Sequence, residues 1–251
     1  MDGLCLGFDT SNYTTSAAVF DGLAGENRGK LLTVEPGSLG LRQSEALFQH
    51  VKRLHLMMEQ LRDDGLIGSI RAVGASTRPR EVEGSYMPCF LVGEGQGRSL
   101  AAALGVPFVA CSHQQGHIAA AAWSAGREDL MDRPHLAWHL SGGTTELLYV
   151  EPEGCMVHAH LIGGTTDISA GQLVDRIGVS LGMGFPAGKA MDAMSMESEQ
   201  EKHFTVKTSE GKFSLSGMEN KIGAMAQGGA APADVARYTF ETLASVLERT
   251  T

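Results

Sequence analysis

The sequence predicts an α/β fold built from two similar lobes. Short apolar segments alternate with segments in which apolar residues recur at helical spacing, which is typical of helices combined with β-sheets. A unit of strand, polar turn and strand occurs near the N-terminus and recurs after residue 134. A chain of 251 residues suits one large domain or two small ones. We therefore expect a first lobe over residues 1–133 and a second over residues 134–251.

Composition restricts the compartment and the class of partner. The four cysteines are scattered without a C-x-x-C pair, which favours a reducing, cytoplasmic location. No apolar run reaches the roughly 20 residues of a membrane span, so we expect no membrane anchor. The net charge of −9 argues against a broad nucleic-acid-binding face, so an RNA contact would be local or supplied by a partner. Many of the 32 glycines lie beside Ser and Thr, which favours a protein that handles phosphate.

The first strand–turn–strand unit carries a candidate cation or phosphate site. The pattern predicts a strand over Gly3–Phe8, a polar turn over Asp9–Ser16 and a returning strand over Ala17–Phe20. Asp9 at the end of the first strand could bind a cation, while the hydroxyl residues after it could bind phosphate oxygens. A polar hairpin loop without a ligand explains the same residues equally well.

The rest of the first lobe reads as alternating helices and strands. The further elements that we expect are a strand at Lys30–Val34, a helix at Ser44–Leu61 with Ser44 as its N-cap, a strand at Ile70–Ala75, a loop at Gly84–Gly97, a helix at Arg98–Leu104 and a strand at Val106–Ala110. Residues 76–80 form a basic segment that is either an anion clamp or a solvated loop.

Two histidines at the start of an Ala-rich helical segment form a candidate metal site. His113 and His117 are four residues apart and therefore share one helix face. Two neutral imidazoles can bind one divalent transition metal, at about 2.0–2.1 Å each for zinc, with a third ligand from elsewhere. Gln114 follows His113, so the segment lacks the general base of the H-E-x-x-H zinc-protease pattern. Ordinary helix residues remain the alternative.

The second strand–turn–strand unit offers a better phosphate site. We expect strands at Leu136–Leu140 and Glu146–Val150 around the turn Ser141–Thr145. Gly142 and Gly143 would let backbone N–H groups approach an anion. Two further histidine pairs, His135 with His139 and His158 with His160, could each share a strand face, and we interpret both pairs as structural.

Two acidic residues flank a glycine-rich loop near the end of the sequence. A helix over Ile168–Leu181 carries Asp175, the loop spans Gly182–Lys189, and Asp192 follows it. Carboxylates beside such a loop can accept hydrogen bonds from ribose hydroxyls, although exposed helix acids would look the same. The last expected elements are a short strand and turn at Lys212–Gly217, a loop at Gln227–Pro232 and a helix at Ala233–Arg249.

Five motifs in order give the chain a resemblance to a known family. They are FDTS, SHQQGH, LSGGTTELL, DISAGQLVDRIGVSLGMGFPAG and FSLSG. Together they resemble the Gcp/TsaD family, the tRNA threonylcarbamoyladenosine transferases formerly described as O-sialoglycoprotein endopeptidases. The resemblance implies two RNase H-like lobes of the actin, sugar kinase and Hsp70 (ASKHA) type that enclose a nucleotide.

The resemblance also implies ligands for particular residues. His113 and His117 would bind one divalent metal, iron or zinc. ATP or threonylcarbamoyl-adenylate would be the nucleotide ligand. The phosphate and threonylcarbamoyl portion of this ligand would contact Leu140, Ser141, Gly142, Gly143 and Thr144. Its adenosine would contact Asp175, Gly188 and Asp192.

The implied reaction transfers a threonylcarbamoyl group from the adenylate to an adenosine next to the tRNA anticodon. tRNA binding would need partner proteins, and a homodimer or a heterodimer with a related subunit is expected. The chain departs from the family pattern, because Thr144 replaces a His and the family's third metal ligand lies beyond Thr251. We therefore interpret it as a divergent, C-terminally truncated paralogue with an incomplete second lobe. A non-catalytic nucleotide-binding scaffold and a metalloendopeptidase are the alternatives.

Overall fold

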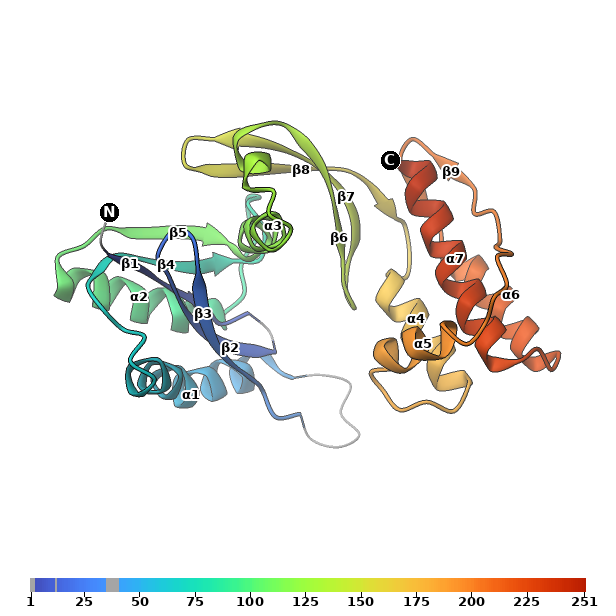
Figure 1. Cartoon of the computed structure of the whole chain (residues 1–251), viewed down its shortest axis with the longest axis horizontal. Coiled ribbons are helices and arrows are strands. Elements are labelled where there is room, and N and C mark those ends of the chain that lie inside the picture. The colour runs from blue at the N-terminus through green and yellow to red at the C-terminus, as the bar shows by residue number, and fades with distance from the viewer. Residues whose placement is uncertain (1–2, 12, 35–40) are drawn as a thin grey trace. The chain divides into compact units, whose positions relative to one another are not determined.

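The computed structural model describes residues 3–11, 13–34 and 41–251 of the chain (Figure 1). Asn12, part of the predicted polar turn, lies outside the described residues. The chain divides into two compact units. The first comprises Met1–Asp132 with Pro152–His158, and the second Arg133–Glu151 with Ala159–Thr251. Each unit is described by itself.

The first unit contains a five-stranded mixed sheet in the order β3-β2-β1-β4-β5. Strand β1 (Leu4–Asp9) is antiparallel to β2 (Thr14–Phe20), which confirms the predicted hairpin. Strand β4 (Ile70–Arg78) is parallel to both β1 and β5 (Phe108–Ser112). The carboxyl ends of these three parallel strands therefore lie at one edge of the sheet.

The third strand lies earlier in the chain than the sequence predicts. Strand β3 spans Gly25–Leu31 and pairs with the whole of β2, so the predicted strand at Lys30–Val34 is correct only at Lys30 and Leu31 and wrong over its remaining residues. The strand occupies an edge of the sheet and nearly all of its residues are exposed. It therefore shows none of the apolar alternation by which a half-buried strand is recognised.

Two long helices cover the same face of this sheet. Helix α1 (Gln43–Asp63) packs Leu54, Met57 and Leu61 against β1 and β2, in one core with residues of α2 (Phe90–Leu104). The predicted N-cap Ser44 lies inside α1, and the N-cap is Arg42 without a side-chain hydrogen bond. Helix α3 (His113–Ser124) follows β5, and a short 3-10 helix, η1, spans Glu128–Asp132.

Helix α2 begins at Phe90, so the predicted loop over Gly84–Gly97 is wrong in its second half. The glycines there have a packing role. A Cβ atom on Gly97 would lie 2.8 Å from the Phe108 ring, and one on Gly93 would lie 3.1 Å from Thr10 Oγ1. Glycine thus lets the helix approach the sheet closely.

The second sheet is also mixed, with the order β6-β7-β8-β10-β9. Its strands are β6 (His135–Leu140), β7 (Thr145–Glu153), β8 (Met156–Thr165), β9 (Thr208–Ser209) and β10 (Lys212–Phe213). Strands β6 and β7 are antiparallel, which confirms the second predicted hairpin, and β10 is parallel to β8. The turn between β7 and β8 belongs to the first unit.

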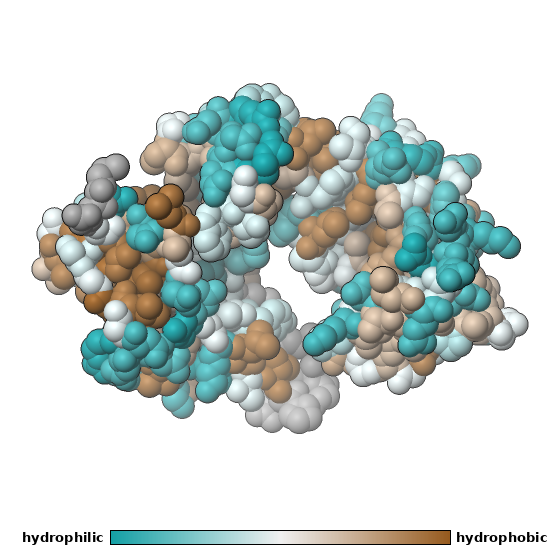
Figure 2. Space-filling model, viewed as in Figure 1, coloured by the Kyte–Doolittle hydropathy of each residue, from teal (hydrophilic) through white to brown (hydrophobic). Residues whose placement is uncertain are grey.

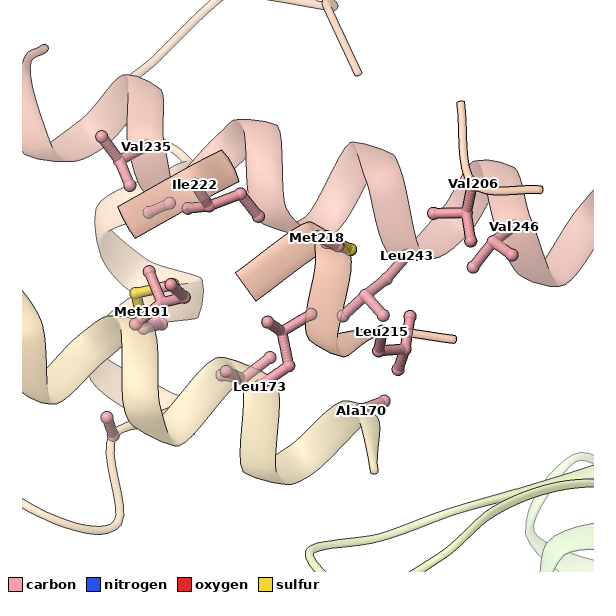
Figure 3. Close-up of a cluster of buried hydrophobic side chains, with 14 of the residues drawn as sticks. Ala170, Leu173, Met191, Val206, Leu215, Met218, Ile222, Val235, Leu243 and Val246 are labelled. Atoms are coloured by element: carbon pink, nitrogen blue, oxygen red, sulfur yellow. The ribbon is translucent and has the colours of Figure 1, made fainter. Parts of the chain in front are cut away.

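Four helices form the main core of the second unit (Figure 3). They are α4 (Ala170–Ser180), α5 (Gly188–Ser195), α6 (Ser216–Gln227) and α7 (Pro232–Thr250). Leu173 from α4, Met191 from α5 and Met218 from α6 are fully buried in this core. The sequence predicts α4 and α7 but neither α5 nor α6, both of which are rich in Gly, Ala and Met.

Apolar side chains remain exposed on both units (Figure 2). Leu23 in the first unit is 87% exposed and Phe185 in the second is 78% exposed. Among the described residues, no helix is both long and apolar enough to cross a membrane.

Candidate functional sites

The first site lies at the carboxyl ends of the parallel strands in the first unit. Strand β1 ends at Asp9, and β5 ends at Ser112, directly before α3. A capping box fixes the start of α3. Ser112 Oγ accepts a hydrogen bond from Gln115 N at 3.2 Å, and Ser112 N donates to Gln115 Oε1 at 2.7 Å. The backbone that carries His113 is therefore held in place on both sides.

The two histidine rings converge as their spacing predicts. His113 Nε2 and His117 Nε2 are 2.9 Å apart, and the ring centroids are 4.3 Å apart. His113 Nδ1 lies 2.7 Å from Asp9 Oδ2. Two imidazole nitrogens that converge in this way fit the donor set of a divalent transition metal, and a carboxylate orients one of the two rings. No third His, Cys, Asp or Glu in the described part of the chain completes a group of three with them.

Asp9 contacts protein groups on both carboxylate oxygens. Oδ1 accepts a hydrogen bond from Ser11 N at 2.8 Å, and Oδ2 accepts one from Ser76 Oγ at 2.8 Å besides its contact with His113. Burial alone would raise the pKa of Asp9, but the hydrogen bond and positive charge of His113, with the bonds from Ser11, hold it well below its usual range. Asp9, predicted as a direct cation or phosphate ligand, is thus placed to orient His113.

Burial lowers the pKa of His117, and the charge of neighbouring His113 lowers it further. The carboxylate of Asp9 acts in the opposite direction with a smaller effect. The result favours the neutral imidazole, which is the form that binds a metal ion.

The second candidate site is the turn between β6 and β7. Ser141 Oγ accepts hydrogen bonds from Gly143 N at 3.1 Å and from Thr144 N at 2.9 Å. Leu140 and the first three turn residues are exposed, and Ser169 at the start of α4 donates to Gly142 O at 2.8 Å. The Ser141 hydroxyl thus occupies two of the N–H groups that the sequence assigns to an anion, so an anion would have to share or displace it.

The remaining predicted residues meet where α4 and α5 adjoin. Asp175 Oδ1 accepts a hydrogen bond from Ala187 N at 2.7 Å, which fixes the end of the glycine-rich loop directly before Gly188. Gly188 and Asp192 lie four residues apart on α5 and share one face. Asp192 is exposed, whereas Asp175 is half-buried and already uses one oxygen to hold the loop.

Asp167 links two of the family motifs through hydrogen bonds that no local sequence pattern predicts. Its carboxylate accepts hydrogen bonds from Ser214 Oγ at 2.5 Å, Leu215 N at 2.8 Å and Ser216 N at 3.2 Å. Desolvation opposes ionisation of Asp167, but these bonds hold its pKa well below the usual range. Asp167, the first residue of the DISAGQLVDRIGVSLGMGFPAG motif, therefore joins that motif to FSLSG and stabilises the start of α6.

Comparison with known proteins gives a consistent family. A family model described as TsaD, tRNA N6-adenosine threonylcarbamoyltransferase, matches residues 40–251, which include the histidine pair but not Asp9. A protein of that name from Thermus thermophilus is 36% identical over 177 residues, covering 69% of this chain and 51% of the relative. One from Lactococcus lactis is 28% identical over 232 residues, covering 87% and 63%.

A solved structure supports the fold at low sequence identity. HypF from T. kodakarensis is 13% identical with a TM-score of 0.58, over 100% of this chain and 39% of that protein. The chain spans about half the length of the Thermus relative. The family model nevertheless matches most of the chain, so this protein belongs to the TsaD family of tRNA N6-adenosine threonylcarbamoyltransferases.

Proposed function

We propose that this protein takes part in transferring a threonylcarbamoyl group from its adenylate to an adenosine next to the tRNA anticodon. The observation that carries the proposal is the convergence of His113 Nε2 and His117 Nε2 at 2.9 Å, in a chain of this family. Asp9 supports it, because ligating histidines usually donate their second ring N–H to such a carboxylate.

His113 and His117 would hold one iron or zinc ion through their Nε2 atoms. When bound, such an ion supplies Lewis-acid polarisation of the carbamoyl oxygen and a template for orienting the donor. In the metal-bound state, Asp9 would accept the Nδ1 proton of His113 in a hydrogen bond, which would leave Nε2 as the ligand atom. Ser76 and Ser11 hold the carboxylate of Asp9 in that position.

The second unit would bind the adenylate. Leu140, Ser141, Gly142, Gly143 and Thr144 would contact its phosphate and acyl portion, and Asp175, Gly188 and Asp192 its adenosine. The exposure of the turn supports the first assignment, in which the phosphate would share or displace the Ser141 hydroxyl that now accepts from Gly143 N and Thr144 N. The contact of Asp175 with the residue before Gly188 supports the second.

The wider setting follows from the same proposal. Residues 1–133 and 134–251 would be two RNase H-like lobes of the ASKHA type, with ATP or threonylcarbamoyl-adenylate as ligand. Because the net charge of −9 disfavours a broad RNA-binding face, partner proteins would help to bind tRNA. The protein would act in the cytoplasm as a homodimer or as a heterodimer with a related subunit, and the dimer would help to bind tRNA.

A transfer assay tests the proposal. The protein would be loaded with Fe²⁺ or Zn²⁺ and incubated with threonylcarbamoyl-adenylate and unmodified tRNA, with and without a partner-containing extract. We expect modified adenosine with the wild type and none with His113→Ala. His55→Ala, at an exposed position of α1, is the matched control and should keep the activity.

The same experiment separates the alternatives. Adenylate binding that depends on Ser141, without transfer under any condition, would replace the proposal with a nucleotide-binding scaffold. Chelator-sensitive cleavage of a glycoprotein without transfer would replace it with a metalloendopeptidase. If the protein neither binds the adenylate nor transfers the group, the proposed function is overturned.

A further inference from the structure

We propose a second divalent-cation site, formed by Glu81, Glu153 and His158 and separate from the His113–His117 pair. Within the described ranges, this is the one group of three His, Cys, Asp or Glu side chains whose ligand atoms all lie within 4.8 Å of one another. Glu81 follows β4, whereas Glu153 ends β7 and His158 lies near the start of β8. All three belong to the first unit.

A buried glutamine brings these separate segments together. The Gln115 side chain is in the core, with 4% of its surface exposed, and its Nε2 donates to Glu81 Oε2 and to Val157 O. The bond to Val157 O is 2.7 Å long. Gln114 N also donates to Pro79 O at 3.1 Å, which ties the segment before Glu81 to α3. Glu81 and the backbone directly before His158 are therefore held together through one buried side chain, and Glu153 reaches the cluster from the adjoining end of β7.

The donor set selects a class of cation. Two carboxylates and one imidazole suit Mn²⁺, Fe²⁺ or Zn²⁺ better than Mg²⁺ or Ca²⁺, because imidazole is a poor ligand for the two hard ions. Arg78 donates to Glu81 Oε1 at 2.6 Å and Gln115 donates to Oε2. Each carboxylate oxygen has a second lone pair, so both contacts leave Glu81 able to bind a cation.

The charges of the cluster also favour a cation. Glu153 is largely exposed, but the Glu81 side chain is only 27% exposed and the His158 side chain 32%. His158 Nδ1 lies 3.4 Å from Glu153 Oε2, longer than an ordinary hydrogen bond. A cation between these groups would join the β7–β8 turn to the segment after β4 and stabilise that arrangement.

The neighbouring pair on the same two strands supplies a matched control. His160 Nε2 lies 2.9 Å from Glu151 Oε1, a His–Glu pair in which His160 is two residues from His158 and Glu151 two residues from Glu153. Within the described residues, this pair is not part of a group of three such ligands. Its removal should therefore leave cation binding unchanged.

Calorimetric titration with Mn²⁺ or Zn²⁺ tests this site. In a His113→Ala/His117→Ala background, we expect one equivalent to bind, with at least tenfold weaker affinity after His158→Gln or Glu153→Gln and no change after His160→Gln. The bound cation should raise the Tm of the background protein but not that of the His158→Gln variant.

If the background does not fold, the wild type should bind two equivalents of Zn²⁺ and the His158→Gln variant one. No cation bound in the background, or binding that His158→Gln leaves unaltered, would overturn the proposal. Transfer activity does not enter these measurements, so failure here is distinguishable from failure of the proposed function.

Discussion

Replacing Asp9 with Asn tests whether this carboxylate organises the histidine pair. In the wild type, one oxygen accepts Ser11 N at 2.8 Å, and the other contacts His113 Nδ1 at 2.7 Å and Ser76 Oγ at 2.8 Å. Asn has one oxygen. If this oxygen faces His113, the amide NH₂ opposes the N–H of Ser11, and if it faces Ser11, the NH₂ opposes the ring N–H of His113.

Either orientation loses a contact as well as the negative charge. Loss of an outer-shell partner of this kind lowers metal affinity by about 10- to 100-fold, or about 1.4–2.7 kcal/mol. Calorimetric titration of Zn²⁺ into the His158→Gln protein measures this change with the second cation site removed.

The matched control is Asp21→Asn. Asp21 accepts two backbone hydrogen bonds at 2.7 Å in an exposed turn of the same unit, without a histidine partner. The Zn²⁺ affinity of this variant should equal that of the His158→Gln protein into which it is introduced. If Asp9→Asn binds Zn²⁺ as tightly as Asp21→Asn, Asp9 has no part in metal binding.

Three further predictions concern stability. Burial lowers the pKa of His50 from 6.5 to about 4, so the unfolded chain binds this proton more readily, and the free energy of unfolding should fall as pH drops through this range. The full decrease in the free energy of unfolding is about 3 kcal/mol. In urea unfolding at several pH values, His50→Gln should weaken the dependence of stability on pH, and His55→Gln should not. Asp167→Ala removes hydrogen bonds at the start of α6 and should lower stability by about 1 kcal/mol in denaturant unfolding; an unchanged midpoint would contradict this role. Gly164→Ala places a Cβ 2.3 Å from a backbone oxygen at a φ of 136° and should destabilise by at least about 2 kcal/mol, whereas Gly223→Ala in open space on α6 should not lower the Tm.

Local sequence patterns predict the hairpins and the start of α3. Both strand–turn–strand units are antiparallel pairs, and the two histidines lie on successive turns at the start of a helix, where a spacing of four brings their rings together. The five ordered motifs identified the family, which the family model confirms. These features can be predicted from the sequence because each depends on residues close together in the chain.

The remaining features depend on contacts between distant segments. Gly93 and Gly97 look like loop residues until the sheet that packs against α2 is present. Asp167 contacts residues 47 to 49 positions away, which no local periodicity reveals. His158, interpreted from sequence as structural, acquires a candidate role only when Glu81 lies beside it.

The most direct test of the central claim is zinc X-ray absorption spectroscopy on the His158→Gln protein with one equivalent of Zn²⁺. We predict two imidazole nitrogens at about 2.0–2.1 Å, with one lost in an additional His117→Ala variant. A spectrum unchanged after His113 and His117 are both replaced by Ala would contradict a metal site at these two residues.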